Sequence, residues 1–415
     1  MARTDAIVLG AGIVGTAIAL HLVKRGLSVA LVDRRGPGEE TSYGNTGIIE
    51  GNTIFPPTFP RGLSALARIA LKRAPEANYH LGFLPKVAPW LMAYRAFSQP
   101  SRLAETARVM RPLFKRAVAE HEALMAEASA SYLMRKTGWL KIYRSDASFA
   151  ATAREREVAE HFGIPIRVLD PDGARTLEPS LNPVFRHALH WEGAASISNP
   201  LALTRAYAAR FTARGGVVLT GDARSLHREG ARWRVDTAEG SVDAYEAVIA
   251  LGPWTPDILA PFGIELPMVV KRGYHLHFRA AGNAGLARPI LDADVGYCLA
   301  PMDQGIRVTT GAEFADRDAP ATPVQLDRVM PAAKELFPLD APAETKPWMG
   351  SRPCFADSRP VIGPAPGHPS LWLAFGHAHW GLTLSAVTGR LVADLVMKTA
   401  PVVDPAPFSA ERFLR

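Results

Sequence analysis

The first 34 residues hold the pattern that most restricts how this chain can fold. Residues 5–34 read DAIVLGAGIVGTAIALHLVKRGLSVALVDR, in which an apolar run, 6–9, leads into the glycines of a GxGxxG pattern. A helical pattern follows, and a second apolar run, 28–32, ends at Asp33. Asp33 lies 18 residues beyond Gly15, near the spacing at which an acid binds ribose. This order predicts a βαβ unit that binds a dinucleotide.

The chemistry of dinucleotide binding explains each glycine of the motif. Gly10 allows the tight turn, Gly12 lets backbone N–H groups approach a pyrophosphate, and Gly15 lets helix and strand pack closely. The helix N-terminus supplies free donors and a positive dipole to the phosphates. The expected cofactor contacts from this unit are Gly10, Gly12, Ile13, Val14, Gly15, Asp33, Arg34 and Arg35.

The segment after the second strand favours FAD over NAD. Residues 41–51, TSYGNTGIIEG, form a polar, glycine-rich loop where a simple dehydrogenase would continue with further βα units. Its hydroxyl, amide and N–H groups suit a pyrophosphate and a bulky ring. The chain has one fingerprint and no CxxC, unlike a flavoprotein reductase that draws electrons from NAD(P)H. The expected contacts here are Thr41, Ser42, Asn45, Thr46, Gly47 and Ile48.

The rest of the chain predicts two interleaved units. Residues 61–160 look largely helical, whereas 268–279 and 295–311 alternate like antiparallel strands. The C-terminal part returns to α/β, with a buried strand at 371–377 and then a helix with one apolar face. We therefore expect an α/β protein in which a Rossmann-like FAD-binding domain is interleaved with an α+β substrate domain containing an antiparallel sheet. The expected boundaries are 1–60, 187–265 and 346–415 for the FAD-binding domain, and 61–186 and 266–345 for the substrate domain.

The composition and charge of the chain restrict which partners the protein can bind. The net charge of +7 is concentrated in 61–116, which carries eleven basic side chains against Glu76 and Glu105. Basic and apolar residues alternate there, as in a membrane-surface element, although a solvated face over an ordinary core is the simpler alternative. No motif indicates nucleic acid, and the two cysteines, Cys298 and Cys354, are too few for a metal or disulfide framework. No apolar run could span a membrane and no signal peptide is evident, so a cytoplasmic protein is expected.

Four segments resemble the D-amino acid oxidase and glycine oxidase superfamily of flavoproteins, and most of all its bacterial D-amino acid dehydrogenases. They are the N-terminal fingerprint, TSYGNTGII, GSRPCFADSRPVIG and FGHAHWGLTLSAVTG, whose order and spacing extend over almost the full length. The resemblance implies non-covalent FAD in a Rossmann-like domain, because Cys354 does not match the position used for covalent attachment. It also implies an antiparallel sheet over the flavin that forms the substrate pocket.

The resemblance assigns the arginine of GSRP, Arg352, to the substrate carboxylate. A guanidinium is a planar fork that pairs bidentately with a carboxylate and stays charged. Pro353 restricts Arg352 to an extended backbone, here expected in a stiff glycine-flanked loop. Gly381 is expected to open the last helix, whose N-terminus would stabilise negative charge on the reduced flavin. An ordinary ion pair is the alternative for Arg352.

Further site residues follow from the resemblance. The pocket-wall tyrosine corresponds to Tyr297, or to Cys298 if the alignment shifts by one, and Tyr274 is a second candidate. His377 and His379 flank the last turn, and each either donates to flavin or substrate or is structural. The remaining expected cofactor contacts are Ala223, Gly252, Trp254, Arg352, His379, Trp380, Gly381, Leu382 and Thr383.

The implied reaction is oxidation of a D-amino acid to an imine, which hydrolyses to a 2-oxo acid and ammonia. FAD would pass the electrons to a quinone or another carrier, with 61–116 docking the protein at the inner face of a membrane. Three alternatives remain: an oxidase or dehydrogenase of secondary amines such as sarcosine, proline or hydroxyproline; a flavin-carrying subunit of a larger complex; and an NAD-dependent dehydrogenase.

Overall fold

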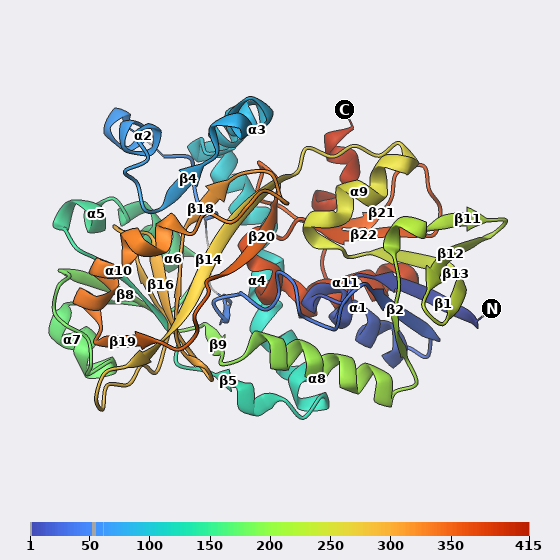
Figure 1. The fold of residues 1–415 in the computed structure, drawn as a ribbon, viewed down its shortest axis with the longest axis horizontal. Helices are drawn as coiled ribbons and strands as arrows, with labels where there is room; N and C mark the ends of the chain where they lie inside the picture. Colours follow the sequence, from blue (N-terminus) through green and yellow to red (C-terminus); the bar gives the residue numbers. More distant parts are fainter. Residues whose placement is uncertain (1, 52–54, 61, 415) are drawn as a thin grey trace.

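Two large β-sheets lie side by side and form the two halves of the molecule (Figure 1). The computed structural model describes residues 2–51, 55–60 and 62–414. The half that holds the N-terminal strand also holds the C-terminal helix, so segments from both ends of the chain build it (Figure 1). The chain therefore crosses between the halves several times, as the interleaved arrangement predicts.

The first sheet is the predicted Rossmann-like sheet. Its central strands run parallel in the order β10-β2-β1-β13-β22. β12 pairs antiparallel with the first half of β13, and β11 pairs antiparallel with β12. β21 pairs antiparallel with β22. The strands are β1 (Ala2–Leu9), β2 (Val29–Asp33), β10 (Val217–Thr220), β11 (His227–Glu229), β12 (Arg232–Thr237), β13 (Gly240–Ile249), β21 (Val361–Pro364) and β22 (Leu371–Phe375).

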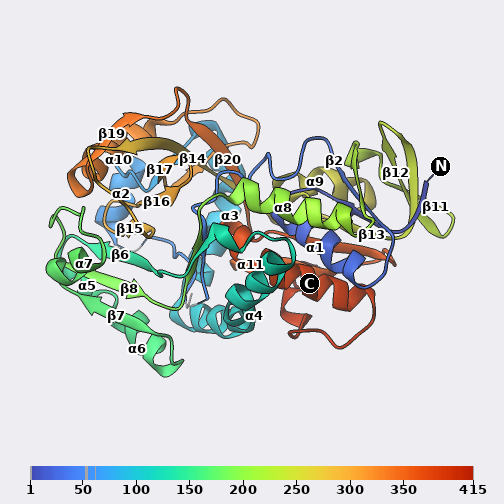
Figure 2. The same cartoon turned by 90° about the horizontal axis from the view of Figure 1, so that it is seen from below.

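Both faces of this sheet are buried, which explains the continuous apolar runs of its strands. Along β1, Ala6 and Val8 face a core shared with the helices of one side, whereas Ile7 and Leu9 face a second core with Trp233. The helices on the first side include α1 (Ile13–Lys24), α8 (Pro200–Ala213) and α11 (Gly381–Val396) (Figure 2). The short α9 (Thr255–Leu259) covers the other side.

The second sheet has eleven strands and is mostly antiparallel. Its order is β4-β18-β14-β17-β16-β15-β6-β8-β7, and β19 and β20 also pair with the long β14. The strands are β4 (Ala77–Tyr79), β6 (Trp139–Tyr143), β7 (Ile166–Leu169), β8 (His187–Trp191), β14 (Val269–Ala280), β15 (Ile290–Asp292), β16 (Tyr297–Met302), β17 (Gly305–Thr309), β18 (Ala312–Phe314), β19 (Leu339–Pro342) and β20 (Trp348–Cys354). One face packs against α10 (Val324–Leu336). This confirms the predicted antiparallel sheet.

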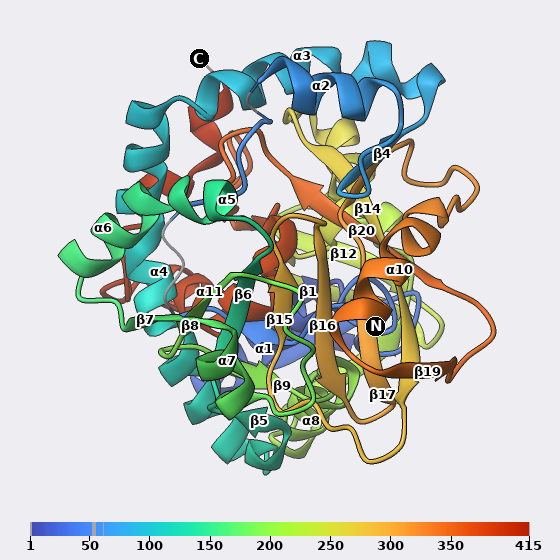
Figure 3. The ribbon, with the colours of Figure 1, turned by 90° about the vertical axis from the view of Figure 1, so that its left-hand side faces the viewer.

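Helices fill most of the predicted helical region (Figure 3). They are α2 (Leu63–Ala70), α3 (Leu84–Phe97), α4 (Pro100–Glu127), α5 (Asp146–Ala150) and α6 (Ala153–His161), followed by α7 (Pro171–Leu177). A small third sheet joins β3 (Ile48–Ile49), β9 (Ala195–Ile197) and β5 (Met134–Arg135).

Two strands lie in a different sheet from the one that their position predicts, and a third is a strand where a helix was expected. β8 and β20 fall in the ranges 187–265 and 346–415, which we assigned to the FAD-binding domain, yet both pair in the second sheet. β6 is a strand of the same sheet within the region expected to be helical. Alternation identifies a strand but not its partner, because pairing is set by contacts with residues far away in the sequence.

Two glycines at the junction between β1 and α1 leave no room for a side chain. Gly10 has φ +105°, and a Cβ placed there would lie 2.6 Å from the Ala250 carbonyl oxygen of the neighbouring strand end. A Cβ on Gly15 would collide with the Gly10 carbonyl oxygen. These glycines therefore let α1 begin directly against β1 and β13, as the motif predicts.

The Gly10→Ala substitution is expected to destabilise the apoprotein by about 3 kcal/mol, because it adds steric overlap to a left-handed backbone. Gly26→Ala is a matched control: Gly26 has φ +87° but open space where its Cβ would lie. It should cost only about 1 kcal/mol. Urea unfolding of the two apoproteins measures the difference, and equal losses would contradict the packing argument.

Candidate active site

A cavity of about 690 Å³ lies where the two sheets meet. The ends of β1 and β2 and the loop 41–46 line it from the first half of the molecule, and β14 and β20 line it from the second. Its volume is in the range typical of cofactor and ligand sites. The cavity thus joins the dinucleotide motif to the antiparallel sheet.

Two helix N-termini reach this cavity. α1 begins after Gly12 and α11 after Trp380; neither N-cap residue caps its helix with its own side chain, and neither helix has an acid in its first turn. Gly12 and Gly381 both line the cavity. A helix N-terminus carries a partial positive charge and unsatisfied N–H groups, so both ends are suited to negative groups of a ligand. The prediction that Gly381 opens the last helix is confirmed.

The loop 41–46 is held by hydrogen bonds to both halves of the molecule. The Ser42 hydroxyl oxygen accepts from the N–H of Ile13 at 2.9 Å, and the Thr41 hydroxyl donates to the Ser351 carbonyl at 3.0 Å. Asn45 donates from its amide nitrogen to the His379 carbonyl at 3.4 Å. The loop therefore bridges α1, β20 and the turn before α11.

Asp33 stands at the end of β2, beside the glycine turn. Its carboxylate accepts from the N–H of Ala11 at 2.6 Å and from the N–H of Arg35 at 3.0 Å. These bonds fix the carboxylate on the cavity wall, where a ribose could reach it.

At the end of the cavity near Asp33 and Trp254, arginine side chains have acidic partners. Arg317 pairs with Asp257 at 2.9 Å and with Asp318 at 2.8 Å. Its guanidinium lies 5.7 Å from the Trp254 ring centre, and that of Arg34 lies 4.6 Å from the same ring. Arg317, Asp257 and Asp318 were not identified from the sequence, because no local motif marks them.

Arg352 differs from these arginines because no carboxylate lies within ion-pair distance of it among the described residues. It donates from Nη1 to the Gly311 carbonyl at 3.0 Å and from Nη2 to the Thr310 carbonyl at 3.4 Å. Burial lowers its pKa below the usual value. The alternative of an ordinary ion pair is therefore not seen in the described part of the chain.

Arg352 lies on a strand and not in the predicted loop. β20 pairs with β14, and Arg352 stands opposite Lys271. A Cβ on Gly273 would lie 2.6 Å from Nη1 and 2.7 Å from Cζ of Arg352, so the guanidinium rests directly on the backbone of β14. Glycine at 273 is thus a requirement for the position of Arg352.

The two predicted histidines have different surroundings. The Nε2 atom of His377 pairs with the Thr388 hydroxyl at 3.0 Å, which ties the turn to α11. Burial lowers its pKa to about 3. Burial, and then the charges of Arg352 and Lys271, also lower the pKa of His379 to about 3. Both rings are therefore neutral at ordinary pH, and His377 has a structural partner.

Neither predicted tyrosine presents its hydroxyl to the site. Tyr297 lies in the core under α10 and donates to the Ala332 carbonyl at 3.1 Å, because alternation along β16 turns its ring to that face. Cys298, its alternative, is a buried thiol that does not line the cavity. Tyr274 lines the cavity, but its hydroxyl donates to Glu313 at 2.6 Å, and Glu313 is paired with the fully buried Arg272.

Most of the other expected residues line the cavity. They are Gly10, Gly12, Ile13, Val14, Asp33, Arg34, Thr41, Ser42, Asn45, Thr46, Ala223, Gly252, Trp254, Arg352, His377, His379, Gly381 and Leu382. Gly15, Arg35, Gly47, Ile48, Trp380 and Thr383 lie outside its lining. Gly15 and Thr383 support residues that line the cavity or lie next to it. Gly15 permits close packing of α1 against Gly10, and the Thr383 hydroxyl donates to the Ile48 carbonyl at 3.0 Å.

This donor set fits a dinucleotide that ends in a redox-active ring. The glycine turn and α1 suit a pyrophosphate, Asp33 suits a ribose, and the α11 terminus suits a ring that becomes negative on reduction. Such a cavity between a Rossmann-like sheet and an antiparallel sheet defines the class of flavin-dependent oxidoreductases.

The chain belongs to the DAO family of FAD-dependent oxidoreductases, whose profile matches residues 5–395. It is 30% identical over 415 residues to a D-amino-acid oxidase of Bradyrhizobium diazoefficiens, and 31% identical over 422 residues to a D-amino acid dehydrogenase of Paramagnetospirillum magneticum; each match covers 98% of both chains. The crystal structure of glycine oxidase from Geobacillus kaustophilus superposes with a TM-score of 0.74 at 23% identity, covering 99% of each chain.

The comparisons confirm the expected family, fold class and cofactor. The protein is an FAD-dependent enzyme of the amino acid oxidase and dehydrogenase family. The NAD-dependent alternative is wrong, because the family uses FAD.

Buried histidines should make the protein less stable in mild acid. The pKa values of His21, His121 and His377 are lowered to about 3, 4 and 3, mainly by burial. The unfolded chain therefore binds protons below about pH 6.5 that the folded chain does not, so stability falls as pH decreases. Each such histidine contributes about 1.4 kcal/mol of loss at pH 5.5.

Urea unfolding at pH 7.5 and 5.5 measures this loss. His377→Asn should weaken the pH dependence by about one proton, since one neutral buried histidine is removed. An unchanged pH dependence in this variant would show that His377 titrates normally.

Proposed function

We propose that the protein oxidises a D-amino acid to its imine, which water converts to a 2-oxo acid and ammonia. The observation that carries this proposal is a partly buried guanidinium, Arg352, that lines the cofactor cavity with only backbone carbonyls as partners among the described residues. The names of the relatives at 30–31% identity support the D configuration.

Arg352 would hold the substrate carboxylate. A buried charge without a counter-ion is unfavourable, so an anionic ligand gains the pairing that the protein itself does not supply. Two parallel N–H donors also fix the orientation of a carboxylate, and hence that of the neighbouring Cα–H. FAD, when bound, accepts the electrons released by oxidation at that carbon.

The charges around Arg352 would also help the substrate amine to lose its proton. Lys271 stands opposite Arg352, and no acid pairs with either side chain among the described residues. Burial lowers the pKa of Lys271, and its ammonium lies 4.2 Å from the Tyr94 ring centre and 4.6 Å from that of Trp90. A nearby positive charge favours the neutral form of a bound amine, which is the form that can be oxidised.

Secondary amines such as sarcosine, proline and hydroxyproline remain the second candidate substrates, because they carry the same carboxylate. A flavin-carrying subunit is the candidate from another class. Anaerobic flavin reduction across both enantiomers of the common amino acids and these secondary amines separates the three. Bleaching by D-amino acids supports the main proposal, bleaching by secondary amines alone supports the second, and no bleaching supports the third.

Arg352→Ala should retain FAD and lose at least about 100-fold in kcat/KM for amino acid substrates, because the carboxylate loses its buried charged partner. Arg317→Ala is the control, since Arg317 lines the same cavity but is paired with acids. It should leave the KM for the amino acid close to the wild-type value. Near-normal flavin reduction by Arg352→Ala would refute the role of Arg352.

Gly273→Ala tests the same role without removing the guanidinium. The added methyl group would occupy the place of the Arg352 guanidinium and displace it. The variant should therefore show a raised KM at unchanged FAD content. A wild-type KM would mean that the position of the guanidinium is not important.

We also propose that a basic and apolar projection contacts an anionic membrane, where a quinone or another carrier would take the electrons. It consists of α2 with the residues 71–73 that follow it, the turn at 81–83 and α3, which lie on the same side of the molecule (Figures 1 and 3). Four of its apolar side chains are well exposed: Leu63 at 86%, Leu71 at 63%, Leu81 at 68% and Met92 at 68%. Its basic residues include Arg68, Lys72, Arg73, Lys86 and Arg95, whereas Arg61 lies outside the described residues. No described helix is long and apolar enough to cross a bilayer.

The protein should bind vesicles containing anionic lipid at low salt and be released by high salt, because basic side chains and exposed leucines act together at such a surface. Sedimentation with vesicles measures this. Leu63→Ser combined with Leu71→Ser should weaken binding without changing flavin content. Val217→Ser combined with Val218→Ser, on an exposed strand of the other half, is the control. Indifference of the wild-type protein to these vesicles would refute the contact.

A further inference from the structure

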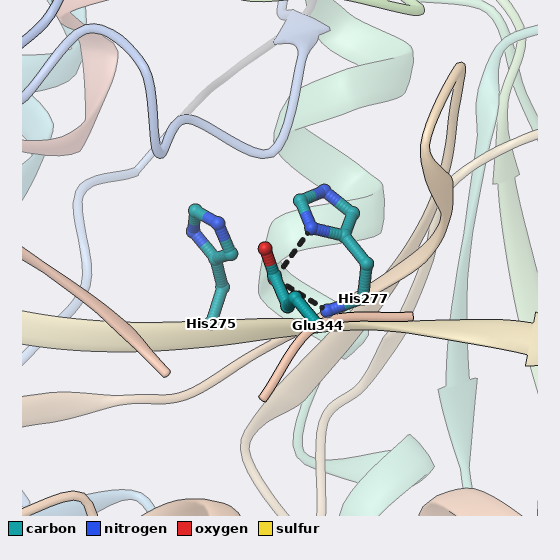
Figure 4. Close-up of side chains that lie close together, drawn as sticks. All are labelled: His275, His277 and Glu344. Carbon is teal, nitrogen blue, oxygen red and sulfur yellow. Dashed lines mark hydrogen bonds and ion pairs between the residues drawn. The ribbon is translucent and has the colours of Figure 1, made fainter. Parts of the chain in front are cut away.

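Three potential metal ligands lie together beside the cavity. His275 and His277 come from β14, and Glu344 follows β19; their ligand atoms lie within 4.8 Å of one another (Figure 4). Neither ring nitrogen of His275 has a hydrogen-bond partner of normal geometry in the described structure. Spacing and residue types alone would therefore suggest a transition-metal centre.

The protons of this group argue against a metal. Arg307 donates from Nε to the Nε2 atom of His277 at 3.0 Å. Because a guanidinium only donates, Nε2 is the unprotonated nitrogen, and the proton of the neutral ring lies on Nδ1. Nδ1 in turn donates to the Glu344 carboxylate at 2.7 Å (Figure 4). A metal on Nδ1 would need the electron pair that this proton occupies, and it would add charge next to a buried cation.

Arg307 is the cation of this group. Its side chain is 2% exposed, and it connects to the Glu344 carboxylate through the His277 ring. The backbone N–H of His277 also donates to Glu344, at 3.0 Å, so that carboxylate oxygen receives two hydrogen bonds from one residue. We call this chain of Glu344, His277 and Arg307 the buried relay.

The far end of the buried relay holds the cofactor loop. Nη1 of Arg307 donates to the Tyr43 carbonyl at 3.0 Å and to the Asn45 carbonyl at 2.5 Å. Gly44, which lies between them, and Asn45 both line the cavity. The guanidinium also lies 5.4 Å from the centre of the Tyr43 ring. The relay thus fixes both carbonyls on either side of a cavity-lining glycine.

The same loop is packed against the wall of the substrate end. A Cβ on Gly44 would collide with the indole of Trp348, a cavity-lining residue. That indole stacks on His275 at 4.8 Å between ring centres. A shift of the loop would therefore change the contact between Gly44 and Trp348 as well as the cavity wall that the loop forms.

We propose that Glu344, His277 and Arg307 are positioning residues that hold the Tyr43–Asn45 segment in the conformation that binds FAD. None of the three lines the cavity, so they act through the loop. The proposal concerns the cofactor and does not depend on which amine is oxidised. Its test by FAD affinity can therefore fail or succeed independently of the proposed substrate.

The test uses glutamine as a replacement that preserves the relay. In His277→Gln the side-chain oxygen can accept from Arg307 while the amide nitrogen donates to Glu344. Its dissociation constant for FAD, measured by flavin fluorescence with apoprotein, should stay within about 3-fold of wild type. His277→Leu breaks both hydrogen bonds to charged groups and should weaken FAD binding by about 10- to 100-fold. Equally weak binding by His277→Gln and His277→Leu would overturn the proposal.

Glu344→Gln keeps the proposal testable if His277→Leu does not fold. The neutral amide no longer requires a proton on Nδ1, so FAD binding should weaken by about 10-fold. Glu335→Gln is the matched control, because Glu335 also accepts from an arginine, Arg144 at 2.7 Å, but lies away from the cavity. Wild-type affinity in Glu344→Gln, or the same loss in Glu335→Gln, would contradict the relay.

The pH dependence of FAD affinity distinguishes the proposed role of His277 from a merely structural one. Protonation of His277 would place a second donor against Arg307, so FAD affinity should fall at low pH in the wild type and not in His277→Gln. The charged and titratable groups that face this ring are Arg307, Glu344 and His275; burial first, and then Arg307, lowers the pKa of His277. The same pH dependence in His277→Gln would assign the effect elsewhere.

Zinc titration of the apoprotein separates the relay from a metal centre. The relay predicts no tight binding, because Nδ1 carries a proton and Arg307 repels a cation. Binding of zinc with micromolar or higher affinity that is lost in both His275→Asn and His277→Gln would overturn the proposal in favour of a metal site.

Discussion

The pairing of β14 with β20 is the interaction on which the proposed substrate end of the cavity depends. Seven residue pairs, from Val269–Cys354 to His275–Trp348, set its register. This register places Arg352 opposite Lys271 and directs its guanidinium over Gly273. A shift by one residue would turn every side chain of the strand to the opposite face. The ladder therefore determines both the charge and the aromatic wall of this end.

The cofactor end depends on a different constraint, which is the close approach of backbone to backbone. The glycine turn lets α1 begin against β1 and β13, and α11 arrives from the other end of the chain. The loop 41–46 then connects these helices to β20 through side-chain hydrogen bonds. Two helix termini and one loop thus surround a single cavity.

Charge is distributed unevenly along this cavity. At the cofactor end, Arg317 and Arg224 pair with neighbouring carboxylates. At the proposed substrate end, Arg352 has no acidic partner among the described residues, nor does Lys271 behind it, and the nearby His379 is neutral. Burying unpaired charge is unfavourable for folding, so its presence at one end is best explained by an anionic ligand that completes the pairing.

The sequence was sufficient for features set by local chemistry. Gly10, Gly15 and Asp33 could be assigned because a tight turn, a close contact and a strand end each demand one kind of residue. Arg352 was found through its GSRP segment, although it lies on a strand and not in a loop. Tyr297 was misplaced, because only strand register decides which face a ring takes. Tyr274 does line the cavity, but its hydroxyl donates to Glu313.

The tertiary structure alone decided which distant residues meet. The relay joins His277, Arg307 and Glu344 from separate segments of the second sheet to a loop near residue 44, and no local pattern marks this contact. The same holds for Trp348 against Gly44 and for the two strands that entered the unexpected sheet. Local motifs follow from backbone geometry within a few residues, whereas pairing and charge networks depend on contacts that exist only after the chain has folded.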